Sequence, residues 1–243
     1  MLSGLPPALV GTYGNRLLAL APDADLNPLR PYLRRVRFQR GECITSAGKT
    51  DRVFFVDSGL ASIVADVDGK QVETCAVGRE SALNVVASIG TGHTCAAGVM
   101  QVEGDVTCAP IDVWSASVKN SAALQDIVGR HIQLFLAITL RNVGCASQHS
   151  AHQRLCRKLL SSRDRTGLDT IPLTQQFLAS MLGVERTTIA DIASDLQQRG
   201  FIAYRHGKIT VLNPQGLSKC ACECYHEIYE LARRIFPEFL TAR

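Results

Sequence analysis

LTQQFLASMLGVERTTIADIASDLQQRGFI, residues 173–202, is the stretch that decides the fold of this chain. Its first part repeats apolar residues at helical spacing: Leu178, Met181 and Leu182. Gly183 follows at a sharp turn, a place that favours a residue able to adopt a positive φ angle. The second part carries one apolar stripe at i, i+3, i+4, i+7: Ile189, Ile192, Ala193 and Leu196. The pattern predicts two short helices joined by a tight turn.

The opposite face of the second helix carries short polar groups and one arginine: Arg186, Thr187, Thr188, Asp191 and Ser194. A solvated helix would normally carry more Lys and Glu, so a plain helical hairpin is the weaker interpretation. Helix-turn-helix proteins insert the first turns of such a helix into the DNA major groove. Thr174 is placed to cap the first helix. We expect DNA contacts from Thr174, Gln175, Glu185, Arg186, Thr187, Thr188 and Asp191.

A β-hairpin signal follows this segment directly. Two short β-type runs, residues 201–204 and 208–212, flank His206-Gly207. This predicts the wing of a winged helix, from which Arg205, His206 and Lys208 reach DNA phosphates. Simple solvation of a basic hairpin is the alternative, which the position after the second helix disfavours.

Length and charge distribution agree with a DNA-binding half. The 243 residues are enough for two domains, each with its own core. Residues 1–149 hold 13 basic and 13 acidic side chains, and residues 150–243 hold 13 and 9, so the whole excess of +4 lies in the second half. Positive charge there suits the neutralisation of phosphates.

The sequence predicts a cytoplasmic protein with no membrane segment. The N-terminus lacks a charged start followed by an apolar core. The longest apolar run, residues 134–140, is far shorter than the about 20 residues that span a bilayer. Nine scattered cysteines, an odd number, favour a reducing compartment and free thiols.

The first half reads as antiparallel β-structure, after a short helical lead-in over residues 16–33. Between residues 36 and 112, short alternating runs are separated by Gly41, Gly48, Gly59, Gly69, Gly78 and Gly104. Asp68-Gly69 is a strong hairpin turn.

From residue 120 to 145 the apolar period becomes helical and covers more than one stripe. Such a helix must bury two faces, one on the β-domain and one on a second copy of itself. A core helix of a monomer is the alternative. We expect the dimer interface at Leu124, Val128, His131, Phe135 and Ile138.

A β-roll, a long connecting helix and a winged helix, in this order, resemble the Crp/Fnr family of bacterial transcription regulators. The most specific matches are VFFVDSG (53–59), VGRES (77–81) and residues 173–200, and CACECY (220–225) resembles one subgroup. The resemblance implies an α+β fold: a jelly-roll-like sensor domain over 1–118, a dimerisation helix over 119–149 and a winged helix-turn-helix domain over 150–243. It also implies a homodimer on a two-fold symmetric operator that contacts RNA polymerase, with recognition helices about 34 Å apart.

Arg186 matches the arginine that reads bases in this family. Its guanidinium can bond O6 and N7 of guanine together. The glutamate that often follows is Thr187 here, and a frequent arginine position is Asp191. The family's commonest half-site is therefore not expected.

The effector pocket of the family is only half present. Cyclic-nucleotide-binding members use a glutamate for the ribose and an Arg-Ser pair for the cyclic phosphate. Gly78, Arg79, Glu80 and Ser81 resemble the first half of this cassette, whereas the second half aligns at His93-Thr94, without the arginine. A buried phosphate without a bidentate cation loses its strongest contact. We expect a small-molecule effector that is not cyclic AMP, or no effector.

Cysteine and histidine offer weaker sensor sites. Cys220, Cys222 and Cys224 form C-x-C-x-C rather than the C-x-x-C usual at zinc sites, and on one helix only Cys220 and Cys224 would share a face. We expect this cluster to be structural, and Cys75 and His93 to be core residues rather than haem ligands. No metal or cofactor is predicted.

The sequence thus predicts a DNA-binding transcription regulator. A ligand- or redox-sensing module that signals mainly through protein contacts is the alternative. No phosphate loop, Gly-x-Ser-x-Gly, His-Glu-x-x-His or reactive carboxylate pair is present in the sequence, so we expect no enzyme.

Overall fold

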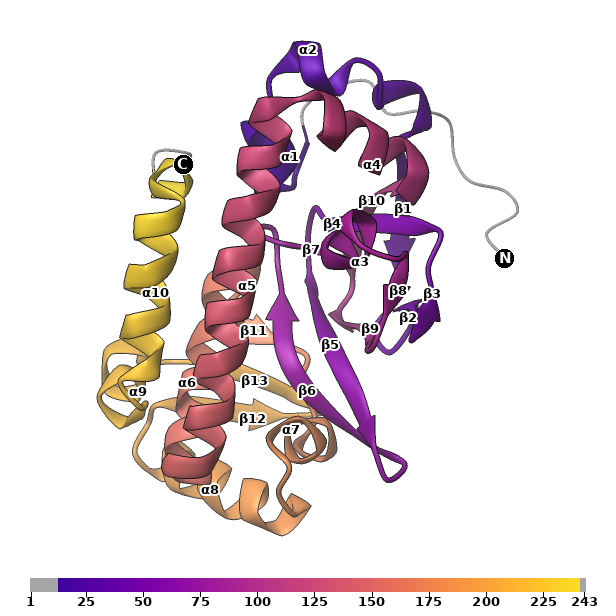
Figure 1. Ribbon diagram of the computed structural model, residues 1–243. Helices are drawn as coiled ribbons and strands as arrows, with labels where there is room; N and C mark the ends of the chain where they lie inside the picture. Colours follow the sequence, from indigo (N-terminus) through magenta and orange to yellow (C-terminus); the bar gives the residue numbers. More distant parts are fainter. Residues whose placement is uncertain (1–12, 241–243) are drawn as a thin grey trace.

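A computed structural model of the chain describes residues 13–240 (Figure 1). Short helices come first, within the predicted lead-in: α1 (Arg16–Leu20), α2 (Asp23–Leu26) and the 3₁₀ turn η1 (Arg30–Tyr32). The strands of the first half are β1 (Arg34–Phe38), β2 (Cys43–Thr45), β3 (Gly48–Lys49), β4 (Arg52–Val56), β5 (Leu60–Val67), β6 (Lys70–Val77), β7 (Ala82–Leu83), β8 (His93–Thr94), β9 (Ala97–Val102) and β10 (Gly104–Pro110). A short helix, α3 (Val85–Ile89), lies between β7 and β8.

These strands form the antiparallel β-roll that the glycine-punctuated pattern predicts. One sheet has the order β1-β10-β4-β7 and a second has the order β2-β9-β5-β6. Alternating residues of both sheets meet in a buried core that includes Phe54, Val56 and Met100. Asp68 and Gly69 both have positive φ, 53° and 74°, in the predicted hairpin turn between β5 and β6. Gly104 allows two backbone segments of the β-roll to approach closely, because a Cβ there would lie 2.1 Å from the Ser58 carbonyl oxygen.

Helix α4 (Ile111–Asn120) leads into α5 (Ala122–Gln148), the long helix of the molecule. The Ser121 hydroxyl accepts a hydrogen bond from the Leu124 amide and so caps α5. One face of α5 packs on the β-roll side of the molecule, in a core shared with Phe55 and Trp114. No described helix is long and apolar enough to cross a membrane.

The structure buries part of the predicted dimer face of α5 within its own chain. Leu124, Val128 and His131 are 1, 5 and 3% exposed and belong to the core of their own chain, while Phe135 and Ile138 are half-buried. Leu136, Leu140 and Val143 carry the exposed apolar surface instead, at 56, 64 and 68%. The apolar residues nearly surround the helix, so their period does not reveal which stripe the β-roll covers.

The C-terminal part is a winged helix. It consists of α6 (Ala151–Thr166), β11 (Thr170–Ile171), α7 (Gln175–Leu182), α8 (Arg186–Gln198), β12 (Ile202–Arg205), β13 (Lys208–Val211), α9 (Pro214–Cys220), α10 (Cys224–Ile235) and η2 (Pro237–Leu240). The small sheet has the order β11-β13-β12. Its core joins α6, α7, α8 and the wing, and it also includes Leu60 and Val102 of the β-roll.

Helix α10 runs back alongside α5 and returns the chain to the first core (Figure 1). Phe236 is fully buried in that core. The Arg130 guanidinium lies 4.7 Å from the Phe236 ring centroid and 2.9 Å from a Glu238 carboxylate oxygen. The C-terminal segment therefore connects the winged helix to the first half of α5, around Arg130.

Candidate nucleic-acid interface

The two helices of the predicted helix-turn-helix are α7 and α8. The Thr174 hydroxyl accepts a hydrogen bond from the Phe177 amide, 3.2 Å away, and caps α7 as predicted. Gly183 ends α7 with φ 62° and ψ 42°, the left-handed conformation that the turn requires. Helix α8 then starts at Arg186 after Glu185, whose side chain forms no capping bond.

Helix α8 has one buried side and one exposed side, as its spacing predicts. Ile189, Ala193 and Leu196 are at most 1% exposed, and Ile192 is half-buried. Glu185, Arg186, Thr187, Asp191 and Ser194 are exposed, and Thr188 is half-exposed. The protein's own body therefore leaves this polar face open at the start of the helix.

The wing lies next to the start of α7. Strands β12 and β13 are antiparallel, and Arg205 lies opposite Lys208 at the end next to the turn. The turn itself holds His206 and Gly207 at φ 49° and 72°. The side chains of Arg205, His206 and Lys208 are exposed. A Cβ on Gly207 would lie 3.2 Å from a Thr174 methyl carbon, so the wing turn and the start of α7 touch.

Gln175 joins the same surface. Its amide donates a long hydrogen bond, 3.4 Å, to the Tyr204 hydroxyl of the wing, and its side chain is half-exposed. The structure thus brings the start of α7 and the wing together, next to the open face of α8. Positive charge comes from an arginine on the helix and from two basic side chains on the wing.

The expected effector residues do not form one pocket. A cavity of about 150 Å³ between the β-roll and α5 is lined by His93 and Thr94, together with Asn84, His131 and Phe135. Arg79 and Glu80 line a different groove, between α6 and α10. The Glu80 carboxylate pairs with Arg165 Nε at 2.8 Å, and Arg79 Nε donates to the Gly14 carbonyl oxygen. Gly78 and Ser81, the remaining residues of the expected set, flank Arg79 and Glu80 in the sequence.

Ser81 turns toward α5. Its hydroxyl lies 2.8 Å from His131 Nε2, a hydrogen bond between the β-roll and the long helix. Burial of the imidazole lowers the pKa of His131 to about 4, so it is neutral near pH 7. The cavity beside it is smaller than the roughly 300 Å³ at which small-molecule pockets begin.

A buried polar contact between the two halves was not predicted. The Lys158 ammonium of α6 pairs with the Glu73 carboxylate of β6, and both side chains are nearly inaccessible, 8 and 11% exposed. Burial lowers the pKa of Lys158, while the Glu73 charge opposes that shift. The Ser62 hydroxyl and the Gln101 amide also donate to Glu73. Neither residue lies in a motif, so the sequence carries no signal for the pair.

A model of the Crp-like helix-turn-helix domain matches residues 153–220. No curated protein matches the sequence. Among solved structures, a Crp/Fnr family protein from Eubacterium rectale is 16% identical, with a TM-score of 0.67, over 85% of this chain and 98% of that one.

Two further solved structures have the same fold. FixK2 from Bradyrhizobium japonicum is 14% identical, with a TM-score of 0.66, over 78% of this chain and 98% of that one. A Crp/Fnr family transcriptional regulator from Thermus thermophilus is 22% identical, with a TM-score of 0.63, over 77% of this chain and 97% of that one. This chain therefore carries a Crp-like helix-turn-helix domain and shares its fold with solved structures of the Crp/Fnr family.

Proposed function

We propose that this protein is a sequence-specific transcription regulator that binds a palindromic operator as a homodimer. The open polar face at the start of α8, with Arg186 exposed, is the observation that carries the proposal. An exposed helix start beside a basic wing suits insertion into a major groove with phosphate contacts on both sides. Action in the cytoplasm and contact with RNA polymerase are part of the same proposal.

Arg186 is proposed to read a guanine. Its planar fork donates two hydrogen bonds to O6 and N7, which a lysine cannot match. Thr187 and Asp191 lie on the same exposed face and replace side chains that are common at these positions in the family. We therefore expect the operator of this protein to differ from the common half-site at the base pairs beside the guanine that Arg186 contacts.

Dimer formation is supported by the exposed apolar stripe of α5. Leu136, Leu140 and Val143 recur at i, i+4, i+7, and each is more than half exposed in the single chain. A contiguous apolar stripe of this kind is costly in water and favours burial against a partner. Pairing the stripe with its copy gives a two-fold axis along α5, as a palindromic operator requires.

The effector is proposed to be something other than cyclic AMP. Glu80 is paired with Arg165, and Arg79 lies on the same groove rather than in the cavity beside α5. His131 and Phe135 close that cavity from α5. An occupant of the cavity would therefore contact the dimerisation helix directly, through groups unlike those that bind a cyclic phosphate.

Selection from random-sequence DNA tests the proposal. We expect the purified protein to enrich a palindrome, and Arg186→Ala to lose about 1–3 kcal/mol of binding and the preference at one base pair of each half-site. Arg186→Lys should keep part of the affinity but not the preference. Arg233→Ala, which removes an exposed arginine on α10, is the matched control and should bind normally. A selection without a consensus would refute sequence-specific binding.

A further inference from the structure

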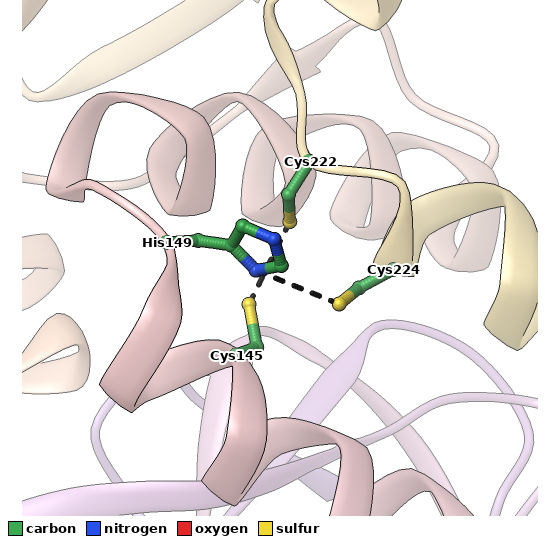
Figure 2. Close-up of side chains that lie close together, drawn as sticks. All are labelled: Cys145, His149, Cys222 and Cys224. Atoms are coloured by element: carbon green, nitrogen blue, oxygen red, sulfur yellow. Dashed lines mark hydrogen bonds between the residues drawn. The ribbon is translucent and has the colours of Figure 1, made fainter.

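Four side chains with metal-ligating atoms converge where α5 ends and α10 begins. Cys145 lies in the last turn of α5 and His149 caps that helix, while Cys222 lies in the turn before α10 and Cys224 is the first residue of α10 (Figure 2). One ligand atom from each side chain lies within 4.8 Å of every other. The cluster contains none of the proposed DNA-contact residues and plays no part in the function proposed above.

Local structure explains the convergence. Cys145 and His149 are spaced i, i+4, which places them on one face at the end of a helix. Residues 220–224 do not form one helix, because α9 ends at Cys220, Ala221 is extended and α10 starts at Cys224. This break lets Cys222 and Cys224 approach the end of α5 together. Cys220 instead accepts a hydrogen bond from Arg199 and lies outside the cluster.

The separations agree with a tetrahedral metal centre. Zn²⁺ bonds of about 2.3 Å to sulfur and about 2.1 Å to nitrogen place two sulfurs about 3.8 Å apart, and sulfur and nitrogen about 3.6 Å apart. The Cys145 and Cys222 sulfurs are 3.6 Å apart, and Cys224 Sγ lies 3.7 Å from His149 Nδ1. We propose that Cys145, His149, Cys222 and Cys224 bind one zinc ion through three thiolates and one imidazole.

His149 also makes the hydrogen bond to a carboxylate that a metal-bound histidine usually makes through its second ring nitrogen. His149 Nδ1 points toward the sulfurs (Figure 2). On the other side of the ring, His149 Nε2 lies 3.0 Å from a carboxylate oxygen of Glu223. A ligating imidazole donates its second N–H to such a carboxylate, which fixes the tautomer and the ring orientation.

Burial and donor number indicate a structural site. Cys145, Cys222 and Cys224 are each 1% exposed, and the protein supplies all four donors, so no position stays open for a substrate. Three thiolates on Zn²⁺ leave a net charge of −1, which the nearby guanidinium of Arg157 favours. An iron–sulfur cluster spreads its four protein ligands over two or more irons, whereas these four donors lie close enough together to surround a single ion.

The proposed site joins two segments of the chain that are distant in sequence. Two ligands come from the dimerisation helix and two from the segment that follows the wing, so one ion would fasten α10 to α5. Helix α10 then continues to Phe236, which is buried in the first core. The metal would therefore hold the C-terminal segment that ties the winged helix to the rest of the chain.

Metal content and cobalt spectroscopy test the site. Protein purified under reducing conditions should contain one zinc per chain by mass spectrometry of the metal. Replacing zinc with Co²⁺ should give the intense visible bands of tetrahedral cobalt and the ultraviolet bands of cobalt–thiolate bonds. This measurement uses the unaltered chain and needs no variant to fold. A zinc-free protein whose cobalt spectrum is octahedral would overturn the proposal.

Matched variants assign the ligands. Cys222→Ser should lose the zinc, while Cys220→Ser, two residues away but outside the cluster, should keep it. Glu223→Gln should weaken zinc binding by about 10- to 100-fold in competition with a chromophoric chelator. Retention of zinc in both Cys145→Ser and Cys222→Ser, a Cys145–Cys222 disulfide in protein isolated from reduced lysate, or visible absorption with acid-labile sulfide would each refute the assignment.

Discussion

Replacing Lys158 with methionine should destabilise the protein strongly. The side chain of Lys158 is 8% exposed and its ammonium pairs with Glu73, which is 11% exposed. Methionine fills a similar volume but removes the ammonium, so that among the described residues the Ser62 hydroxyl and the Gln101 amide remain as hydrogen-bond donors to the carboxylate. Breaking a buried ion pair by removing one partner costs about 3–5 kcal/mol, a large part of the roughly 5–15 kcal/mol that stabilises a domain.

A double-mutant cycle separates the pair from the loss of either side chain. Removing both charges, in Glu73→Gln with Lys158→Met, leaves no uncompensated ion, so it should cost much less than the sum of the two single changes. Urea unfolding followed by far-UV circular dichroism and by fluorescence of Trp114, the only tryptophan, measures each free energy. Glu230→Gln, at an exposed pair with Arg233, is the control and should cost at most about 1 kcal/mol. If Lys158→Met costs under about 1 kcal/mol and the cycle is additive, the buried-pair reasoning is refuted.

Three further outcomes follow from single positions. Burial lowers the pKa of His131 to about 4, whereas in the unfolded chain this imidazole protonates near pH 6.5. Burial of neutral His131 therefore contributes nothing unfavourable to the free energy of unfolding above that pH. On acidification from pH 7.5 to pH 5, the unfolded chain takes up a proton first, so the free energy of unfolding falls by about 2 kcal/mol. His131→Gln should remove this part of the pH dependence in urea titrations, and equal slopes in both proteins would contradict it. Lys208→Ala should reduce the slope of log binding constant against log salt by about one, and an unchanged slope would exclude a phosphate contact. Leu140→Glu should shift the protein toward monomer in analytical ultracentrifugation, whereas Val67→Glu, at a similarly exposed residue on β5, should not; a stable Leu140→Glu dimer would move the interface elsewhere.

The helix-turn-helix could be predicted from the sequence because its signals are local. The stripe at Ile189, Ala193 and Leu196 and the turn at Gly183 each depend on neighbours a few residues away. Backbone geometry decides such features, so the caps, the buried face and the wing turn lie where the pattern indicates. The glycine-punctuated strands of the β-roll are local in the same sense.

Features that depend on long-range packing could not be predicted. The apolar residues of α5 cover so much of its surface that periodicity does not distinguish Val128, which meets the core, from Leu140, which meets solvent. The spacing of Cys220, Cys222 and Cys224 does not reveal that the extended Ala221 separates α9 from α10. Cys145 and Cys222 are 77 residues apart, so only the fold brings them together.

The positions of the fastening contacts limit how an effector could act. The Glu73–Lys158 and Glu80–Arg165 pairs join the β-roll to α6, and the proposed metal site joins α10 to α5. With the winged helix held at both places, an occupant of the β-roll cavity has little freedom to move one domain alone. Helix α5 is different, because it contributes His131 and Phe135 to the cavity and Leu136 and Leu140 to the proposed dimer contact. In the proposed dimer, an occupant that favours one position of α5 would therefore change the relation between the two chains, and with it the spacing of the two α8 helices that are proposed to read the operator.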